Sequence, residues 1–329
     1  MSGVKRRDFV SLLGGAAVTW PLAARAQQRT QPVIGFMSSR SPEDSEGVVA
    51  AFRKGLSEGG LVEGRNVLLE FRWARGEYNR LPSLAAELVN QSVTVLVAAG
   101  GEASALTAKA ATSTIPIVFI SSDPVKSGLV ASLNRPGGNA TGFHFITTDL
   151  ESKRLGLLDE LFPGTAILGG LVNPKSPPAS AQAVEINEAA RKLGRTVILL
   201  NATTDSELNA VFGSLSQRHV TAMLVAADPF FDTRRDQLIL LAAKYSVPIV
   251  YPMREFALAG GLMSYGTSAS EAYHQVGIYA AKIVNGAKPA ELPVMQSIKF
   301  EQVINLKTAR MLGFEFPPTF SARADEVIE

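Results

Sequence analysis

Short apolar runs alternate with stretches of helix length along most of the chain, and this alternation constrains the fold more than any other feature. The runs have the length and β-branched composition of buried strands, and the segments between them have amphipathic helical spacing. Apolar strands separated by helices form parallel sheets, because right-handed crossovers place helices on both faces. The predicted strands are residues 33–37, 67–73, 93–98, 117–120, 167–172, 197–200, 222–226 and 249–251. The pattern predicts an α/β protein with doubly wound parallel sheets.

The second series of strands repeats the first at an offset of about 130 residues. Three short segments return in the same order: GRNVLL (64–69) as GRTVIL (194–199), LVAA (96–99) as LVAA (224–227), and PIVF (116–119) as PIVY (248–251). Buried parallel strands are built from the same few apolar residue types, so chance similarity of these segments is the alternative. Because the order of the matches is kept, we predict two similar lobes of one topology.

The boundary between the lobes is predicted near residues 143–149, after the turn-rich segment RPGGN at 135–139. The segments that follow the second series are too short for a third domain, so we expect them to cross back between the lobes as hinge strands. The predicted domains are an export signal peptide at 1–26, an N-terminal lobe at 30–145 plus 266–296, and a C-terminal lobe at 146–265 plus 297–329.

The first 26 residues have the composition of a targeting segment. Lys5, Arg6 and Arg7 precede a weakly apolar stretch, and a small-x-small cleavage site ends at Ala26. The adjacent arginines before Asp8 resemble a twin-arginine signal, which exports proteins after folding. We therefore expect a periplasmic protein whose signal is removed; an ordinary Sec signal or an uncleaved basic tail is the alternative.

The apparent basicity of the chain belongs to this signal. Its removal takes away four of the 32 basic residues and one of the 30 acidic residues, so the net charge falls from +2 to −1. No basic cluster remains to track phosphates, which argues against nucleic acid as a partner. The chain has no cysteine, which excludes disulfides and thiolate metal sites. No other apolar run is long enough to span a membrane, and we expect the mature chain to be a soluble monomer.

In open parallel sheets, ligands bind beyond the carboxyl ends of the strands, where helix N-termini present free N–H groups. The repeat allows these ends to be identified in both lobes. The predicted ligand-binding residues are Ser38, Ser39, Gly100, Gly101, Ser121, Ser122, Asp123, Asn173, Asp228, Phe230, Tyr251 and Tyr265. They combine hydroxyls and bare backbone with acidic and aromatic groups, which suits a small molecule with a polar end and an apolar body.

Each of these residues also has a structural interpretation. Asp123 and Asp228 precede prolines and fit helix N-caps. The glycines at 100–101 fit a tight strand-to-helix turn, and the serines at 38–39 fit a helix cap. The aromatic residues fit the core.

The sequence lacks the common catalytic motifs. The three histidines, His144, His219 and His274, lack HExxH spacing and have no acidic partner nearby in sequence. The chain has no Gly-Lys pair for a phosphate-binding lysine loop, no GxGxxG after the first strand and no GxSxG elbow. We therefore expect no enzyme activity, no cofactor and no metal.

Several segments together resemble the tryptophan/tyrosine-type family of ABC transporter substrate-binding proteins. They are KRRDF at 5–9, DPV at 123–125, GLV at 128–130, RPGGNATG at 135–142, GGLMSYG at 260–266 and INLKTA at 304–309. The resemblance implies a type I periplasmic-binding-protein fold, a hinge of three crossings and an extracytoplasmic receptor that docks on a membrane permease. It also implies a small organic ligand, which is an aromatic or other amino acid or a small carboxylate. A sensory subunit for a receptor kinase and an exported α/β enzyme are the alternatives.

Overall fold

The structure is a computed structural model that describes residues 31–146, 150–164 and 167–329. Val33–Glu329 form one compact unit, which contains two β-sheets. No helix in the described part of the chain is long and apolar enough to cross a membrane. The predicted export signal at 1–26 lies outside the described residues and stays a prediction.

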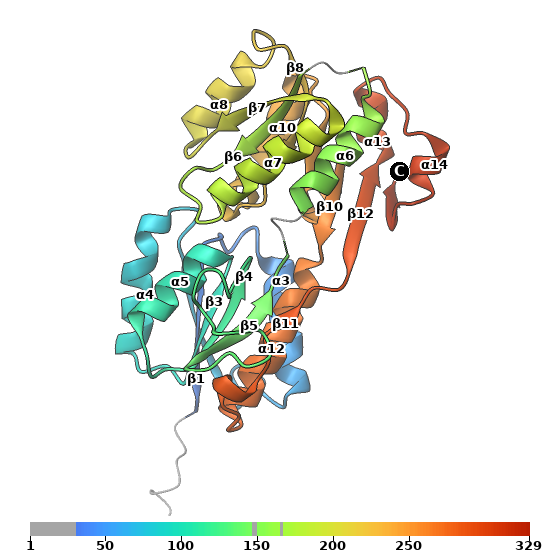
Figure 1. The fold of residues 1–329 in the computed structure, drawn as a ribbon. Coiled ribbons are helices and arrows are strands. Elements are labelled where there is room, and N and C mark those ends of the chain that lie inside the picture. Colours follow the sequence, from blue (N-terminus) through green and yellow to red (C-terminus); the bar gives the residue numbers. More distant parts are fainter. Residues whose placement is uncertain (1–30, 147–149, 165–166) are drawn as a thin grey trace, which may run out of the picture. The chain divides into compact units, whose positions relative to one another are not determined.

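The first sheet has six strands in the order β11-β5-β4-β3-β1-β2, and all of its strand pairs are parallel (Figure 1). Its strands are β1 (Val33–Ser38), β2 (Leu68–Trp73), β3 (Val95–Ala99), β4 (Ile117–Ser121), β5 (Ala140–His144) and β11 (Met295–Gln296). Its helices are α3 (Glu46–Glu58), α4 (Leu81–Asn90), α5 (Glu102–Ala111) and α12 (Ala269–Val284), with short 3-10 turns at Tyr78–Arg80 and Pro289–Glu291. We call this sheet and its helices the first lobe.

The second sheet has seven strands in the order β13-β12-β10-β9-β8-β6-β7, and only the β10–β12 pair is antiparallel. Its strands are β6 (Ile167–Val172), β7 (Thr196–Asn201), β8 (Val220–Val225), β9 (Ile249–Tyr251), β10 (Met263–Thr267), β12 (Phe300–Asn305) and β13 (Glu326–Ile328). Its helices are α6 (Glu151–Leu161), α7 (Ala179–Leu193), α8 (Asp205–Ser214), α9 (Pro229–Asp232), α10 (Arg235–Lys244), α11 (Arg254–Leu258), α13 (Leu306–Met311) and α14 (Pro318–Ser321). This group is the second lobe.

The two lobes share one topology. The order β2-β1-β3-β4-β5 of the first sheet matches the order β7-β6-β8-β9-β10 of the second. All eight predicted strands are present, with ends that differ by at most two residues. The predicted doubly wound α/β class with two similar lobes is therefore confirmed.

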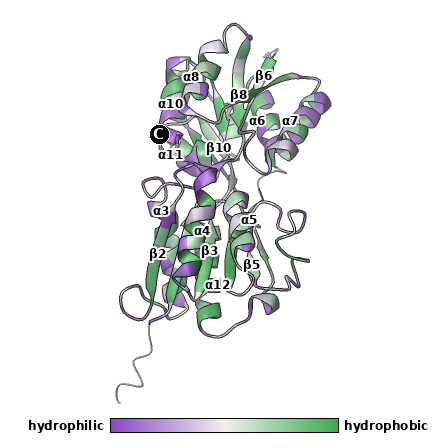
Figure 2. Ribbon diagram, turned by 90° about the vertical axis from the view of Figure 1, so that its left-hand side faces the viewer, coloured by the Kyte–Doolittle hydropathy of each residue, from purple (hydrophilic) through white to green (hydrophobic). Residues whose placement is uncertain are grey.

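Helices cover both faces of each sheet (Figure 1). In the first lobe α3 packs with α12 and α4 packs with α5, and in the second lobe α6 packs with α7 and α8 with α10. Figure 2 shows hydrophobic strands at the centre of each lobe and hydrophilic residues on the outer helices. The central strands are buried on both faces, as parallel strands between two helix layers must be.

The eight predicted strands do not include β5, β10, β11, β12 or β13, although β10 and β12 lie in the segments that were expected to cross between the lobes as hinge strands. β5 has the sequence ATGFH, and β10 has MSYGT, so neither shows a continuous apolar run. Gly142 in β5 and Gly266 in β10 leave no room for a Cβ, which would meet the backbone oxygens of Phe119 and Pro252. Close backbone approach at these glycines replaces the side-chain packing that makes a strand visible in a sequence.

The chain passes between the two sheets three times. The passages lie between β5 and α6, between β10 and α12, and between β11 and β12. Residues 147–149 of the first passage lie outside the described residues. Two passages contact each other, because Thr267 Oγ1 donates to the backbone oxygen of Ile146 at 2.9 Å. The residue bounds of the two domains remain a prediction.

Helices α3 and α12 come close together because each has a glycine at the contact. A Cβ on Gly55 of α3 would meet the backbone oxygen of His274, and one on Gly277 of α12 would meet that of Phe52. The return of α12 to the first lobe, after the chain has left that lobe at the end of β5, thus depends on small residues at this crossing.

We expect Gly55→Ala to lower the free energy of unfolding by about 1–3 kcal/mol, because the added methyl group forces the two helices apart. Gly47→Ala in the same helix is the matched control, because Gly47 is exposed with no atom near the position of a Cβ. Alanine there raises helix stability by up to about 1 kcal/mol. Thermal and urea unfolding of both variants measures the difference. Equal stability of the two variants would contradict the packing described.

Candidate functional site

A pocket lies between the lobes, where the carboxyl ends of strands from both sheets face each other. It holds about 680 Å³ of space between atoms, part of it open to solvent. Its lining residues are Arg40, Tyr78, Gly100, Gly101, Glu102, Ala103, Ile120, Ser121, Ser122, Phe145, Ser176, Pro177, Pro178, Ala227, Asp228, Pro229, Asp232, Met253, Ala269 and Tyr273. Most of this wall is apolar, with a few polar groups between the apolar side chains.

Five of the predicted site residues line the pocket: Gly100, Gly101, Ser121, Ser122 and Asp228. The two glycines have φ values of +79° and +103°, a region that favours glycine. A Cβ on Gly100 would lie 2.6 Å from the Ser39 hydroxyl. The glycines therefore place bare backbone at the pocket wall, as the sequence predicts.

Ser38 and Ser39 lie behind this wall and do not line the pocket. Ser39 Oγ donates to the backbone oxygen of Gly100 at 2.5 Å, and Ser38 Oγ accepts from the backbone N–H of Arg40 at 3.1 Å. Neither serine caps α3, which begins at Glu46. Both serines fix the loop that carries Arg40 and the turn at Gly100.

Asp228 has both the predicted structural role and a place in the pocket. It caps α9, since its Oδ1 accepts from the backbone N–H of Phe230 at 3.0 Å and from Asn173 Nδ2 at 2.8 Å. Asn173 is buried and supports Asp228 from behind. Phe230 is also buried, against Phe231. Neither residue lines the pocket.

Asp123, Tyr251 and Tyr265 lie elsewhere. Asp123 does not cap a helix; its Oδ1 accepts from the Lys126 backbone at 3.2 Å in a turn. It lines a second hollow, which we call the rim groove, formed by Glu102, Leu106, Ser122, Asp123, Lys126, Ser127, Pro177, Pro178, Ser180, Ala181 and Glu185. Tyr251 is fully buried and stacks on Phe256 at 4.6 Å, which is the predicted core alternative. The Tyr265 ring lies beside Phe300, outside the pocket.

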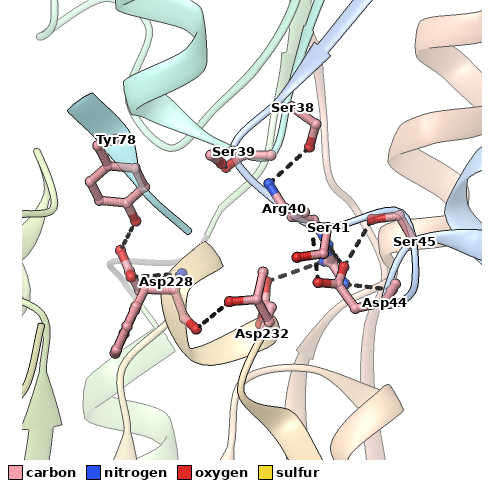
Figure 3. A network of polar contacts seen from close by, with 12 residues as sticks. Ser38, Ser39, Arg40, Ser41, Asp44, Ser45, Tyr78, Asp228 and Asp232 are labelled. Atoms are coloured by element: carbon pink, nitrogen blue, oxygen red, sulfur yellow. Dashed lines mark hydrogen bonds and ion pairs between the residues drawn. The ribbon is translucent and has the colours of Figure 1, made fainter. Parts of the chain in front are cut away.

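Two direct contacts join the lobes at the pocket (Figure 3). Tyr78 OH of the first lobe donates to Asp228 Oδ2 at 2.6 Å, and Arg40 Nη1 donates to Asp232 Oδ2 at 3.1 Å. Arg40 is buried, and its Nε also donates to Asp44 Oδ1 at 2.8 Å. These contacts hold the two lobes together at one side of the pocket.

Burial changes the electrostatics of these groups. It raises the pKa of Asp228, against hydrogen bonds from Ser176, Tyr78 and Asn173. It also raises the pKa of Tyr78, which faces the Asp228 carboxylate. Burial raises the pKa of Asp232 to about 7, although the Arg40 guanidinium opposes this effect. The Arg40 guanidinium thus faces two carboxylates, and no other Lys or Arg is among the residues that line the pocket.

Glu102 is the most unusual carboxylate of the pocket. Its Oε2 accepts from Ser121 Oγ at 2.5 Å, Ser122 N at 2.9 Å, Ser122 Oγ at 3.0 Å and Asp123 N at 3.3 Å. Its Oε1 is buried and has no hydrogen-bond partner. Ser121 and Ser122, the predicted serines at the end of β4, therefore hold the Glu102 carboxylate in place.

Sequence reasoning missed Arg40, Tyr78, Glu102, Asp232 and Tyr273. Arg40 and Glu102 lie three and four residues beyond the predicted strand ends at 37 and 98, so their position after a strand is the signal that marks them. Tyr78 follows the edge strand β2, and Tyr273 lies on α12, which returns to the first lobe from a distant part of the chain. No local pattern marks the latter two. Among the described residues, no cluster of three or more His, Cys, Asp or Glu side chains is arranged to hold a metal ion.

Comparison with known proteins identifies the family. The family model described as ABC transporter substrate binding protein matches residues 41–328, which is most of the chain. The chain belongs to the ABC transporter substrate binding protein family. The family is one of substrate-binding proteins and is not an enzyme family, which agrees with the resemblance stated above.

Individual relatives agree with this assignment. A tyrosine-binding protein of Clostridioides difficile (strain R20291) is 27% identical over 294 residues, which cover 88% of this chain and 84% of the relative. The structure of an ABC domain in complex with L-Trp from Streptococcus pneumonia has a TM-score of 0.82 at 23% identity and covers 91% of this chain and all of the other. The ligand-free, open structure of a substrate binding protein with adhesive properties from Clostridium difficile has a TM-score of 0.63 at 25% identity, with 91% and 99% covered.

In this substrate-binding protein a buried ion pair supports the second-lobe side of the pocket. Glu151 and Arg154, both in α6, are essentially inaccessible to solvent, and Arg154 Nη2 lies 2.8 Å from Glu151 Oε1. The same oxygen accepts from the backbone N–H of Ala227, a pocket residue, at 3.4 Å. Arg154 Nη1 donates to the backbone oxygen of Tyr265 at 3.0 Å. Burial raises the pKa of Glu151, and the Arg154 charge opposes this effect.

Arg154→Met should lower the free energy of unfolding by about 3–5 kcal/mol, because it leaves the Glu151 carboxylate buried without a cation. The double variant Glu151→Gln/Arg154→Met removes that charge as well and should recover part of the loss. Urea unfolding at pH 8, where Glu151 in the unfolded chain is ionised, measures both values. A double variant that is no more stable than Arg154→Met would show that the loss comes from packing instead of charge.

Proposed function

We propose that this protein is the extracytoplasmic substrate-binding protein of an ABC importer and that it traps an aromatic amino acid between its two lobes. The observation that carries the proposal is the pocket itself. It combines an apolar wall with a few polar groups, and it lies between the strand ends of both lobes. A ligand with an apolar body and a polar head fits such a wall.

The apolar part of the pocket comes from both lobes. The first lobe contributes Ile120 of β4, Phe145 after β5 and Tyr273 of α12. The second lobe contributes Pro177 after β6 and Met253 after β9. Aromatic and sulfur-containing side chains make favourable contacts with aromatic rings. The relatives that are described as binding tyrosine or holding L-Trp support the same ligand class.

The contacts between the lobes support a closed state. The hydrogen bond from Tyr78 to Asp228 and the Arg40–Asp232 pair exist only while the lobes touch. The TM-score is higher against the structure in complex with L-Trp than against the ligand-free, open structure, at 0.82 and 0.63. Ligand binding then works by population shift, because a ligand that touches both lobes favours the closed state.

The remaining parts of the proposal concern location and partners. Substrate-binding proteins of ABC importers work outside the cytoplasm and deliver ligand to a membrane permease. The basic, apolar and small-x-small pattern of residues 1–26 supports export by a twin-arginine signal to the periplasm. We propose that the mature protein is a monomer that binds its ligand without catalysing a reaction.

Calorimetric titration of the mature protein tests the ligand class. L-Trp, L-Tyr and L-Phe should bind, whereas L-Leu should bind weakly and D-allose should not bind. A ligand at a hundredfold excess over its Kd should stabilise the folded protein by about 2.7 kcal/mol in thermal unfolding.

Two variants of α5 provide the matched comparison. Ala103 lines the pocket, and Ala110 is an exposed alanine of the same helix. Ala103→Trp fills part of the pocket and should abolish binding, whereas Ala110→Trp should bind like the original protein. Binding of the sugar in place of the amino acids would refute the proposed ligand class, and turnover of any bound compound would refute the binding-protein role.

A further inference from the structure

We propose that Glu102 binds a positively charged group of the ligand and so makes the site selective for amines over the corresponding carboxylic acids. This inference rests on the proposed function and names the residue that sets its specificity. Asp123 and Asp228 are the acidic residues among the predicted ligand-binding residues, and the structure points to a different carboxylate.

The side chain of Glu102 is held in one position by the first lobe. Its Oε2 receives four hydrogen bonds, from two hydroxyls and two backbone N–H groups at the end of β4. The residue is 7% exposed and lines both the pocket and the rim groove. Such a carboxylate is preorganised, because four hydrogen bonds fix its rotamer before a ligand arrives.

The second oxygen of Glu102 is left without a partner. Oε1 is buried and accepts no hydrogen bond. None of the ion pairs among the described residues includes Glu102. A buried carboxylate oxygen that lacks both a donor and a cation is unfavourable. A ligand that brings an ammonium group to Oε1 removes this penalty, and an uncharged ligand does not.

The cations near Glu102 are engaged or placed elsewhere. Arg40 lines the same pocket, but its donors go to Asp44 and Asp232. Lys126 lies in the rim groove and forms no ion pair with Glu102. No cation among the described residues is therefore paired with Oε1, and in our proposal the cation that pairs with it enters with the ligand.

The other acidic groups of the site are less suited to this role. Both oxygens of Asp228 already accept hydrogen bonds, from Tyr78, Asn173 and Phe230. Asp123 does not line the pocket. Asp232 also has one buried oxygen without a partner, but its other oxygen is paired with the Arg40 guanidinium. Asp232 is therefore the rival that the experiment must separate from Glu102.

The start of α5 adds a complementary feature. Glu102 is the first residue of this ten-residue helix, and Gly101 gives it no side-chain cap. Gly101, Glu102 and Ala103 all line the pocket. The first-turn N–H groups of a helix favour a negative group such as a carboxylate. An amino acid carries its ammonium and its carboxylate two bonds apart, so one end of α5 offers partners for both.

Glu102→Gln tests the inference with little change of shape. The amide oxygen can accept the four hydrogen bonds that Oε2 receives, and the NH₂ group then takes the place of Oε1. Calorimetric titration compares L-Trp with indole-3-propionate, which lacks the ammonium group. The original protein should prefer L-Trp by a factor on the order of 100, and Glu102→Gln should reduce this preference at least on the order of tenfold while still binding indole-3-propionate.

Two further variants complete the experiment. Glu46→Gln is the matched control, because Glu46 is the exposed first residue of α3 as Glu102 is the buried first residue of α5, and it should keep the original preference. Asp232→Asn tests the rival, and it should keep most of the preference even if both ligands bind less tightly.

The outcomes separate the two proposals. An original protein that binds L-Trp and indole-3-propionate equally, an unchanged preference in Glu102→Gln, or a preference lost only in Asp232→Asn would overturn the role of Glu102 and leave the aromatic ligand class intact. If the original protein binds neither compound, the proposed function fails together with this inference. Retained binding of indole-3-propionate by Glu102→Gln also shows that the variant is folded.

Discussion

A hydrogen bond between Tyr78 and Asp228 joins the two lobes beside the pocket, and the arrangement of the site depends on it. Asp228 is buried and Tyr78 is partly buried, so water competes little for this hydrogen bond while the lobes touch. Parallel strands make this meeting possible, because the ends of all strands that carry loops to the pocket lie at one edge of each sheet. Asn173 and the first turn of α9 hold Asp228 in place from the second lobe. Closure and the shape of the pocket are therefore coupled.

The first lobe supplies the preorganised part of the site. Gly100 and Gly101 expose backbone at the start of α5, and the serines of β1 fix that turn from behind. Four hydrogen bonds then hold Glu102 against the end of β4. The second lobe contributes mainly apolar surface and the Asp228 cap. A ligand would contact the fixed polar groups of the first lobe and be covered by the surface of the second. This division favours binding to the first lobe while the lobes are apart, followed by closure.

Most of the fold could be predicted from the sequence, and five of the predicted site residues line the pocket. Continuous apolar strands and the internal repeat were sufficient for two lobes of one topology, because parallel strands buried on both faces leave a strong pattern. β5 and β10 were missed because glycine contacts replace their apolar runs. Strand-end reasoning found Gly100, Ser121 and Asp228, but it also included Tyr251, which points into the core of the second lobe. Tyr78 and Tyr273 reach the pocket only through the tertiary fold, so no local pattern could reveal them.

The central claim is that the lobes close on a ligand, and a distance measurement between them tests it most directly. The chain has no cysteine, so spin labels can be attached at Ala86→Cys in α4 and Ala210→Cys in α8, two exposed alanines of different lobes. These helices lie on the side of the molecule away from the chain crossings (Figure 1). Pulsed electron resonance should give a shorter and narrower distance distribution when a binding ligand is added, while a pair at Ala86 and Ala110 within the first lobe stays the same. An unchanged distance between the lobes at saturating ligand would contradict the account.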